Sequence, residues 1–421
     1  MNQLLYACLD GLADDPIPEL GGRTPLEAAR TPVLDNLARR GAQGLVYTVG
    51  PDIAPESDIA VFAILGYDPR EDHPGRGVLE AIGSGMEFRD GELAYRVNFA
   101  TQEDGEIVDR RVGRDLPSED AEALAGEVNG RLRLPGATFE LRATVEHRGA
   151  LVIRSTNGAL SANVSNTDPA YAREGTLGVA LATFENRAAE ARPLDDSEAA
   201  RRAADLTNRF VEGAAAILEG SPVNARRRAE GRLPANLVLT RDGGDHVPKL
   251  QPIRDRFGPA WGCFVEMPVE RGIAMVLGMA PVDAPTGMAR RDQYAAWAEL
   301  AAEALGGYDA LYIHIKGPDV PAHDGRAEDK REVIEDIDAA FFGELLPRID
   351  TGRTLLAVTA DHATSCLRKA HTADPVPLLV AGPRVSADAT GAFGEREARA
   401  GALGTMSGVD ILPRLVELLR T

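Results

Sequence analysis

TLLAVTADH, residues 354–362, is a run of apolar, β-compatible residues that ends in an aspartate and a histidine. Neighbouring side chains on a strand point to opposite faces, so Asp361 and His362 can meet one partner only where the strand has ended. The pattern therefore predicts a buried strand that delivers two ligand-type side chains at its carboxyl end.

Two other apolar runs, QLLYACL from residue 3 and ALYIHI from residue 310, also lead into acids or histidines. Ligands of an open α/β sheet bind outside the carboxyl ends of its strands, so residues from several strand ends can meet in one place. A solvated loop residue is the ordinary interpretation of each side chain alone, but their shared position favours one site. The residues concerned are Asp10, Asp319, His323, Asp361, His362 and His371.

The composition indicates an ordinary globular chain of two domains. A single core stops growing at roughly 250–300 residues, whereas this chain has 421. Its net charge of −19 opposes binding to nucleic acid or to anionic membranes. Three scattered cysteines, no secretory leader and no run of ~20 apolar residues predict a cytoplasmic protein that does not enter membranes.

Strands and helices alternate in the first and last parts of the chain. Thr31 is placed as the N-cap of a helix, and a strand is expected over residues 45–49. The alternation resumes at Gly272 with IAMVLGM. This order predicts an α/β domain with a mainly parallel sheet flanked by helices, formed by residues 1–73 and 268–421.

The intervening segment, residues 74–267, has a different pattern. Short alternating runs such as YRVNFAT and ATFELRATVEH predict antiparallel strands, and residues 118–128 and 197–218 predict helices. The segment is therefore expected to be an inserted α+β domain. It contains two basic clusters, DRRVGR with Arg110, Arg111 and Arg114, and NARRR at residues 224–228. Arginine binds carboxylate and phosphate bidentately, so the first cluster is equally an anion site or a solvated face, and the second is expected at the surface.

Ser57 lies where a loop rich in proline and glycine meets a short helical pattern over residues 59–65. A serine at such a junction is usually an N-cap. The same position suits a nucleophile, because the amides at a helix N-terminus stabilise a phosphoryl group carried on the serine. Position alone leaves both interpretations open.

The acids and histidines of the strand ends are too many for one catalytic zinc ion, which takes three protein ligands. They fit two ions ~3.5–4 Å apart, a pair that suits phosphoryl or sulfuryl transfer. Mixed carboxylate and imidazole ligands favour Mn, Zn, Fe or Co over the all-oxygen sites of Mg or Ca. Coordination to such an ion would activate Ser57 Oγ without a histidine base.

A set of longer motifs covers nearly the whole chain in order: ELGGRTPLEAARTPVLDNLA, ESDIAVFAILGYDP, VDRRVGR, SNTDP, PVNARRRAEGRLPAN, HDG and TADHATSCLRKAHTADPVP. In these motifs the chain resembles the archaeal-type 2,3-bisphosphoglycerate-independent phosphoglycerate mutases of the alkaline-phosphatase-like superfamily. The resemblance implies a phosphatase-like α/β domain with an inserted substrate domain. It also implies interconversion of 3- and 2-phosphoglycerate through a phosphoserine, without 2,3-bisphosphoglycerate.

Carried over position by position, the resemblance implies two ligand sets. The first set is Asp10, Ser57, Asp361 and His362. The second set is Asp319, His323 and His371. Manganese is the expected metal, with Zn, Co, Fe and Mg as alternatives. The expected anchors of the glycerate are Arg110, Arg111 and Arg114, with Asn166 and Asp168 of SNTDP as partners of its hydroxyl groups.

Three other functions stay open at this point. A metal-dependent phosphatase requires only that water receives the phosphoryl group from Ser57. A phosphotransferase acting on another small phosphorylated metabolite, like a homoserine kinase, fits the broader family, although the chain has no Walker A motif. A metal-binding protein without turnover would lack a ligand or the nucleophile, and all of these are present. The expected partner of an enzyme here is a small phosphorylated acid, and the sequence carries no signal for the oligomeric state.

Overall fold

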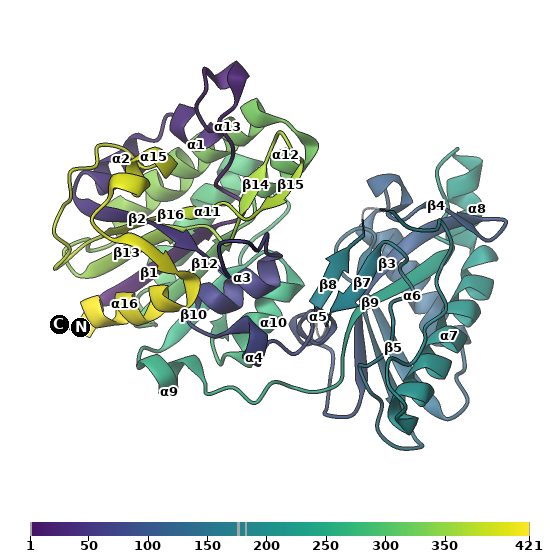
Figure 1. The fold of residues 1–421 in the computed structure, drawn as a ribbon. Helices are drawn as coiled ribbons and strands as arrows, with labels where there is room; N and C mark the ends of the chain where they lie inside the picture. Colours follow the sequence, from purple (N-terminus) through teal and green to yellow (C-terminus); the bar gives the residue numbers. More distant parts are fainter. Residues whose placement is uncertain (1, 175–176, 182, 421) are drawn as a thin grey trace. The chain divides into compact units, whose positions relative to one another are not determined.

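The computed structural model describes residues 2–174, 177–181 and 183–420. The chain divides into two compact units, which Figure 1 colours along the sequence. Unit 1 comprises Met1–Asp72, Leu250–Glu266 and Ile273–Thr421. Unit 2 comprises His73–Lys249 and Met267–Gly272. Each unit has its own sheet.

Unit 1 is built on an eight-stranded sheet. In spatial order its strands are β11 (Ala280–Pro281), β10 (Trp261–Val265), β12 (Ala310–Ile315), β1 (Gln3–Leu9), β13 (Thr354–Thr359), β16 (Val376–Ala381), β2 (Gly41–Tyr47) and β17 (Gly404–Ser407). β16 is antiparallel to both of its neighbours, and the other neighbouring pairs are parallel. The predicted mainly parallel α/β sheet is therefore confirmed.

The central strands β12, β1 and β13 explain why their sequences are continuous apolar runs. Every residue of β12 and β13 is buried, as is every residue of β1 after Gln3. Strands covered by helices on both faces need apolar side chains on both faces. Because the three strands are parallel, their carboxyl ends lie at one edge of the sheet. None of the helices in the described ranges has the length and apolarity that crossing a membrane requires.

Helix α2 (Pro32–Ala38) begins where it was predicted, but its cap is different. Thr31 occupies the N-cap position, and its side chain makes no capping hydrogen bond. The backbone amides of Val33 and Leu34 donate instead to the carboxylate of Asp338, at 3.2 and 2.8 Å. Asp338 is fully buried and lies 304 residues from Leu34, so no local pattern could reveal this cap.

Two segments differ from the sequence predictions. IAMVLGM does not resume the alternation with a strand, because most of it lies in the helix α10 (Pro268–Val276). A short apolar run fits a buried strand or a buried helix equally well, which is the physical reason for the error. The strand that pairs with β12 on this side of the sheet is β10, which lies in the segment that was expected to be inserted. β2 also begins earlier than predicted, at Gly41.

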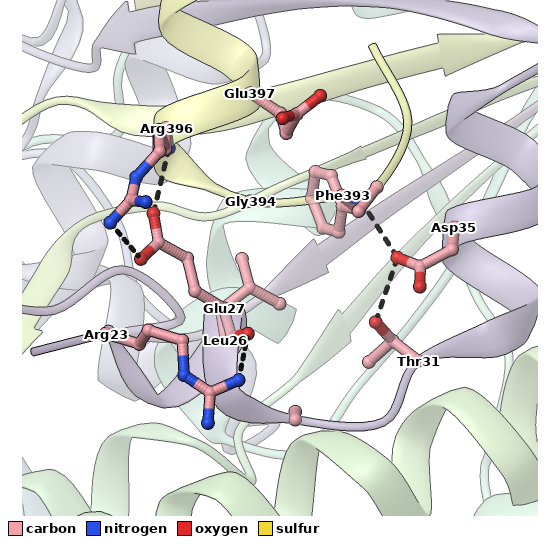
Figure 2. A pocket seen from close by; sticks show the side chains of 11 residues that line it. Arg23, Leu26, Glu27, Thr31, Asp35, Phe393, Gly394, Arg396 and Glu397 are labelled. Atoms are coloured by element: carbon pink, nitrogen blue, oxygen red, sulfur yellow. Dashed lines mark hydrogen bonds and ion pairs between the residues drawn. The ribbon is translucent and has the colours of Figure 1, made fainter. Parts of the chain in front are cut away.

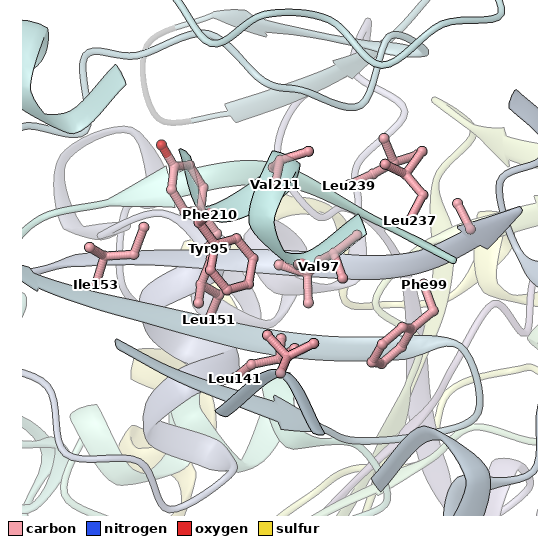
Figure 3. Close-up of a cluster of buried hydrophobic side chains, with 14 of the residues drawn as sticks. Tyr95, Val97, Phe99, Leu141, Leu151, Ile153, Phe210, Val211, Leu237 and Leu239 are labelled. Atoms are coloured by element: carbon pink, nitrogen blue, oxygen red, sulfur yellow. The ribbon is translucent and has the colours of Figure 1, made fainter. Parts of the chain in front are cut away.

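Unit 2 has the α+β character expected of the insertion. Its central strand β3 (Leu93–Glu103) pairs antiparallel with β4 (Glu106–Asp109), β6 (Arg148–Ser155) and β9 (Leu237–Gly244), and β6 pairs with β5 (Ala137–Ala143). Figure 3 shows the core on one face of this sheet, where Tyr95, Leu151 and Phe210 gather. The helices α6 (Ser118–Arg131) and α7 (Glu198–Glu219) supply the other side of that core. The antiparallel strands are therefore confirmed.

Asp338 should make the stability of the protein fall as the pH rises. Burial raises the pKa of Asp338 to about 6, against ~3.9 for an aspartate in an unfolded chain. The folded state therefore holds the proton more tightly, and the free energy of unfolding decreases between pH ~4 and ~6 and is level outside this window. We expect the stability advantage of the wild type over Asp338→Asn to decline across these pH values in urea titrations. A difference that does not change with pH would contradict this assignment.

Candidate active site

The predicted metal-site residues lie together in unit 1, at the carboxyl edge of its central strands. Asp10 follows β1, and Asp361 and His362 follow β13. The remaining members come from nearby short elements. These are Ser57 at the start of α3 (Ser57–Ile64), Asp319 and His323 on α12 (Asp319–Asp324), and His371 on β15 (Ala370–Thr372).

The first ligand set converges on Nε2 of His362. This nitrogen lies 3.2 Å from Ser57 Oγ. It also lies 3.4 Å from Asp10 Oδ1 and 3.3 Å from Asp361 Oδ2. Ser57 is the first helical residue, because Glu56 occupies the N-cap position. The interpretation of Ser57 as an N-cap is therefore wrong, and its hydroxyl faces the acids and the histidine.

Asp10 and Asp361 each have one oxygen bound by protein donors and one left open. Asp361 Oδ1 accepts from the backbone amides of Gly11 and His362, at 3.1 and 3.0 Å. Asp10 Oδ2 contacts Lys316 Nζ and lies 3.2 Å from His314 Nε2. Asp10 Oδ1 and Asp361 Oδ2 have no hydrogen-bond partner among the described residues, although both side chains are fully buried.

The two open oxygens are the ones that face His362 Nε2. A buried carboxylate oxygen without a partner is costly, and bound cations are one way in which proteins satisfy such groups. Asp10, Asp361, His362 and Ser57 therefore fit one divalent metal ion.

The second ligand set is equally compact. Nε2 of His323 lies 3.2 Å from Nε2 of His371, and the two atoms lie 3.4 and 3.7 Å from Asp319 Oδ1. Nδ1 of His323 is 3.2 Å from the carbonyl of Lys369, and Nδ1 of His371 is 2.8 Å from the carbonyl of Pro55. Carbonyl oxygens only accept, so the proton of each neutral ring is on Nδ1 and the lone pair is on Nε2. This arrangement is typical of histidines that bind a metal.

The electrostatics of the site also suit cations. Burial, together with the charge of Asp10, raises the pKa of Asp361 to about 6. Burial and the neighbouring His371 lower the pKa of His362 to about 3, which keeps its imidazole neutral at physiological pH. Burial opposes the charge on His371, but its hydrogen bond to Asp319 raises its pKa to about 9. Neutral imidazole and ionised carboxylate are the forms that coordinate metals, so His362 is already in its coordinating form, whereas His371 is protonated at physiological pH and releases that proton when it binds a metal.

Sequence reasoning missed His314 and Lys316, which both bind Asp10 Oδ2. Burial opposes the ionisation of Asp10, but the ammonium of Lys316, the hydrogen bond from His314 and the charge of His362 together outweigh it and lower the pKa of this carboxyl. A signal was available, because a histidine is unusual in a fully buried apolar strand such as ALYIHI, and a half-buried lysine directly follows it.

Unit 2 carries the five residues that were predicted to bind the glycerate. Arg110 donates two hydrogen bonds to Asp168, at 2.8 and 2.6 Å, so these two residues bind each other. The side chain of Asn166 bonds to backbone, donating to the Tyr171 carbonyl at 3.0 Å and accepting from the Asp242 amide at 3.2 Å. Neither Asn166 nor Asp168 presents an unengaged side chain.

A larger arginine cluster surrounds the predicted residues. Burial lowers the pKa of Arg111, and the charges of Arg114 and Arg110 lower it further. Burial, together with the charges of Arg241 and Arg76, lowers the pKa of Arg96 to about 9. These shifts indicate that several guanidinium groups lie close together, most of them buried or half-buried, whereas Arg114 is exposed. The group, here called the arginine cluster, comprises Arg76, Arg96, Arg110, Arg111, Arg114, Arg148 and Arg241.

Two members of the arginine cluster have a buried Nε without a hydrogen bond to any described residue, Arg96 and Arg241. Each Nε lies at ion-pair distance from a carboxylate, 3.8 Å from Glu80 and 3.6 Å from Asp242. Arg241 also stacks on Tyr171, with its guanidinium carbon 4.1 Å from the ring centroid. Buried guanidinium donors and repelling positive charges fit a small anion. Arg96 could have been found from YRVNFAT, where an arginine interrupts an apolar strand.

The sequence predicted that the second basic cluster lies at the surface, but one of its three arginines is buried. Arg227 of NARRR is 1% exposed, donates to the carbonyl of Leu233 at 2.8 Å and pairs with Asp115 at 2.5 Å. Its neighbours Arg226 and Arg228 are exposed and pair with surface acids. Arg227 is therefore a structural residue of unit 2.

A surface pocket of unit 1 contains none of the predicted site residues. Figure 2 shows it between α1 (Pro25–Ala28), α2 and the segment around Phe393. Several of its polar groups bind each other: Arg396 lies 3.7 Å from Glu27, and the Thr31 hydroxyl donates to Asp35 at 3.2 Å. These contacts are those of a structural surface.

Comparison with known proteins agrees with the site. The family model described as 2,3-bisphosphoglycerate-independent phosphoglycerate mutase matches residues 38–224. Proteins of that name from Aeropyrum pernix and Methanopyrus kandleri are 43% and 39% identical, over 99% of this chain and 99% and 96% of their own lengths.

Solved structures give the same result. The cofactor-independent phosphoglycerate mutase from Thermoplasma acidophilum is 32% identical, with a TM-score of 0.67 and 100% of each chain covered. The PH0037 protein from Pyrococcus horikoshii is 31% identical, with a TM-score of 0.81, over 100% of this chain and 97% of its own. The resemblance seen in the motifs is therefore confirmed, and this chain belongs to the 2,3-bisphosphoglycerate-independent phosphoglycerate mutases.

Proposed function

We propose that this protein interconverts 3-phosphoglycerate and 2-phosphoglycerate through a phosphoserine on Ser57, without 2,3-bisphosphoglycerate. The observation that carries the proposal is the convergence of Ser57 Oγ with the open oxygens of Asp10 and Asp361 on His362 Nε2. A serine surrounded by acids gains nothing as a nucleophile unless cations are bound there, and the adjoining set of Asp319, His323 and His371 supplies a second cation site.

Ser57 is placed to accept and return the phosphoryl group. Its Oγ attacks the phosphorus of the bound phosphoglycerate, the bond to the glycerate oxygen breaks, and the serine proton is released to solvent or to the departing oxygen. Ser57 is the first residue of α3, so backbone amides at the helix N-terminus favour the negative charge that it then carries. Return of the phosphoryl group to the other glycerate hydroxyl completes the isomerisation.

The two ligand sets would hold two divalent ions, with manganese as the expected metal. Such ions lower the pKa of a coordinated hydroxyl and neutralise the charge of the transferred group. Neighbouring residues of the protein determine which oxygen of each carboxylate is available for coordination. Lys316 and His314 occupy Asp10 Oδ2, and backbone amides occupy Asp361 Oδ1, so the other oxygen of each carboxylate would be the one to hold an ion.

The arginine cluster is the proposed anchor of the glycerate. A phosphoglycerate carries a carboxylate and a phosphate, and planar guanidinium groups bind both in bidentate fashion. The positive charges gathered around Arg111 and Arg96 support this role, because neighbouring guanidinium groups lower the pKa of both. A glycerate that is held after its phosphoryl group has left can take the group back before water does.

Metal removal should reduce both stability and activity. Ions at a hundred times their Kd stabilise the folded state by about 2.7 kcal/mol per site, so chelation should lower the melting temperature and added Mn²⁺ should restore it. His371→Ala should bind one ion fewer by elemental analysis. His246→Ala, which removes an exposed histidine of unit 2, is the matched control and should retain both ions. An active, unchelated preparation without bound metal would remove the basis of the proposal.

Ser57→Ala should abolish the mutase reaction, with a fall in kcat of roughly a thousand-fold or more. Its fold and most of its metal affinity should remain, because the other ligands of both sets are unchanged. Ser365→Ala is the matched control, since Ser365 is also a buried serine of unit 1 and its hydroxyl donates to Asp15 at 2.7 Å. Near-wild-type turnover by Ser57→Ala would indicate direct attack by a metal-bound hydroxide.

Loss of the arginine cluster should convert part of the mutase activity into phosphatase activity. Arg111→Ala and Arg241→Ala should raise the ratio of inorganic phosphate to 2-phosphoglycerate, because the glycerate escapes before the phosphoryl group returns. Arg226→Ala, an exposed arginine of the same unit, should leave the ratio unchanged. The wild type should need no added 2,3-bisphosphoglycerate. Phosphate as the main wild-type product, with an unchanged ratio in the variants, would favour a phosphatase.

A further inference from the structure

The side chain of Thr364 links the two ligand sets. Thr364 lies on β14 (Ala363–Ser365) and is fully buried. Its hydroxyl donates to Asp319 Oδ1 at 2.8 Å and lies 3.0 Å from Nδ1 of His362. One bond therefore reaches a member of the second set, and the other reaches a member of the first.

The direction of both bonds follows from the chemistry of the groups. An ionised carboxylate only accepts, so the single hydroxyl proton of Thr364 goes to Asp319. The bond to His362 must then be donated by the ring, which places the ring proton on Nδ1. The lone pair of His362 is left on Nε2, the atom that faces Ser57, Asp10 and Asp361.

His362 differs from the other two histidines in how its tautomer is fixed. The Nδ1 atoms of His323 and His371 bond to backbone carbonyls, which no substitution of a side chain removes. Nδ1 of His362 bonds to the Thr364 hydroxyl. The tautomer of His362 can therefore be changed by replacing one side chain outside both ligand sets.

The surroundings of Thr364 hold this hydroxyl in place. The backbone amide of Thr364 donates to the carbonyl of Ala13 at 3.0 Å, and its carbonyl accepts from Lys330 Nζ at 2.9 Å. Gly11 has φ +63°, and a Cβ there would lie 2.6 Å from Thr364 Oγ1 and 2.9 Å from Asp319 Oδ1. A side chain at position 11 would therefore clash with the Thr364 hydroxyl, and glycine avoids this clash.

We propose that Thr364 is a positioning residue that serves both metal sites at once. Its hydroxyl holds His362 in the tautomer that presents Nε2 and orients the carboxylate of Asp319. The inference rests on the proposed function, because it takes both ligand sets to bind metal. It goes beyond that function by assigning the geometry of two sites to one group that ligates neither.

The test compares Thr364→Val, which keeps the shape and removes the hydroxyl, with Thr364→Ser, which keeps the hydroxyl. Mn²⁺ affinity and stoichiometry are measured by calorimetry on the full chain. The tautomer of His362 is read from ¹⁵N shifts of labelled histidine in the metal-free protein. Thr359→Val is the control, since Thr359 is also fully buried and its hydroxyl donates to the Pro377 carbonyl at 3.0 Å.

Thr364→Val should weaken Mn²⁺ binding at both sites by roughly 10- to 100-fold, the usual cost of losing a group that orients a ligand. The His362 ring should also lose its preference for a proton on Nδ1. Thr364→Ser should stay close to the wild type, and so should Thr359→Val. If Thr364→Val does not fold, Thr364→Ala removes the same hydroxyl and takes its place.

Wild-type affinity at both sites in the hydroxyl-free variant, with an unchanged tautomer, would overturn the inference. Equal losses in Thr359→Val would also overturn it, because they would show a general effect of buried threonines. If the wild type itself binds no divalent ion, the proposed function fails. The histidine spectra of the metal-free protein then still decide whether Thr364 sets the tautomer.

Discussion

The buried ion pair between Lys330 and Asp14 is the interaction on which the candidate active site depends. Lys330 Nζ donates to Asp14 Oδ2 and to the carbonyls of Ala13 and Thr364, at 2.9, 3.1 and 2.9 Å. A buried ammonium costs several kcal/mol unless its donors are satisfied, and here three donors meet three oxygens. Lys330 thereby ties the loop after β1, which carries Asp10, to the hairpin after β13, which follows His362. The ammonium of Lys330 thus fixes the two segments next to Asp10 and His362, although Lys330 is not one of the predicted metal ligands.

Burial of these acids is electrostatically unfavourable. Asp10 and Asp361 are fully buried, burial opposes the ionisation of both, and each keeps an oxygen without a hydrogen bond among the described residues. Such local conflict is expected at functional sites, where the fold stabilises an arrangement that its own contacts do not favour. The protein donors bind only the outward oxygen of each carboxylate. The inward oxygens are thus kept available for cations.

The features that depend on residues close together in the sequence were predicted. Contacts between residues far apart in the sequence were missed. Apolar strands that end in Asp10, Asp361 and His362 were visible, because parallel strands must place their carboxyl ends together. The cap of α2 by Asp338 and the pairing of Arg110 with Asp168 were not visible, because each joins segments far apart in the chain. Ser57 was left between N-cap and nucleophile, and the structure removes the first interpretation because Glu56 occupies the N-cap position.

The acids of the candidate active site in unit 1 and the arginine cluster in unit 2 require counterions of opposite sign. A chain with a net charge of −19 repels an anionic substrate at a distance, so binding must come from local positive charge. In unit 2 that charge is the arginine cluster, in which neighbouring guanidinium groups lower the pKa of Arg96 and Arg111. In unit 1 the acids exclude an anion until cations are bound, because bound ions are the largest local charges in such a site. The proposed function accounts for both requirements, because cations would neutralise the acids of unit 1 and the anionic groups of a phosphoglycerate would pair with the arginines of unit 2.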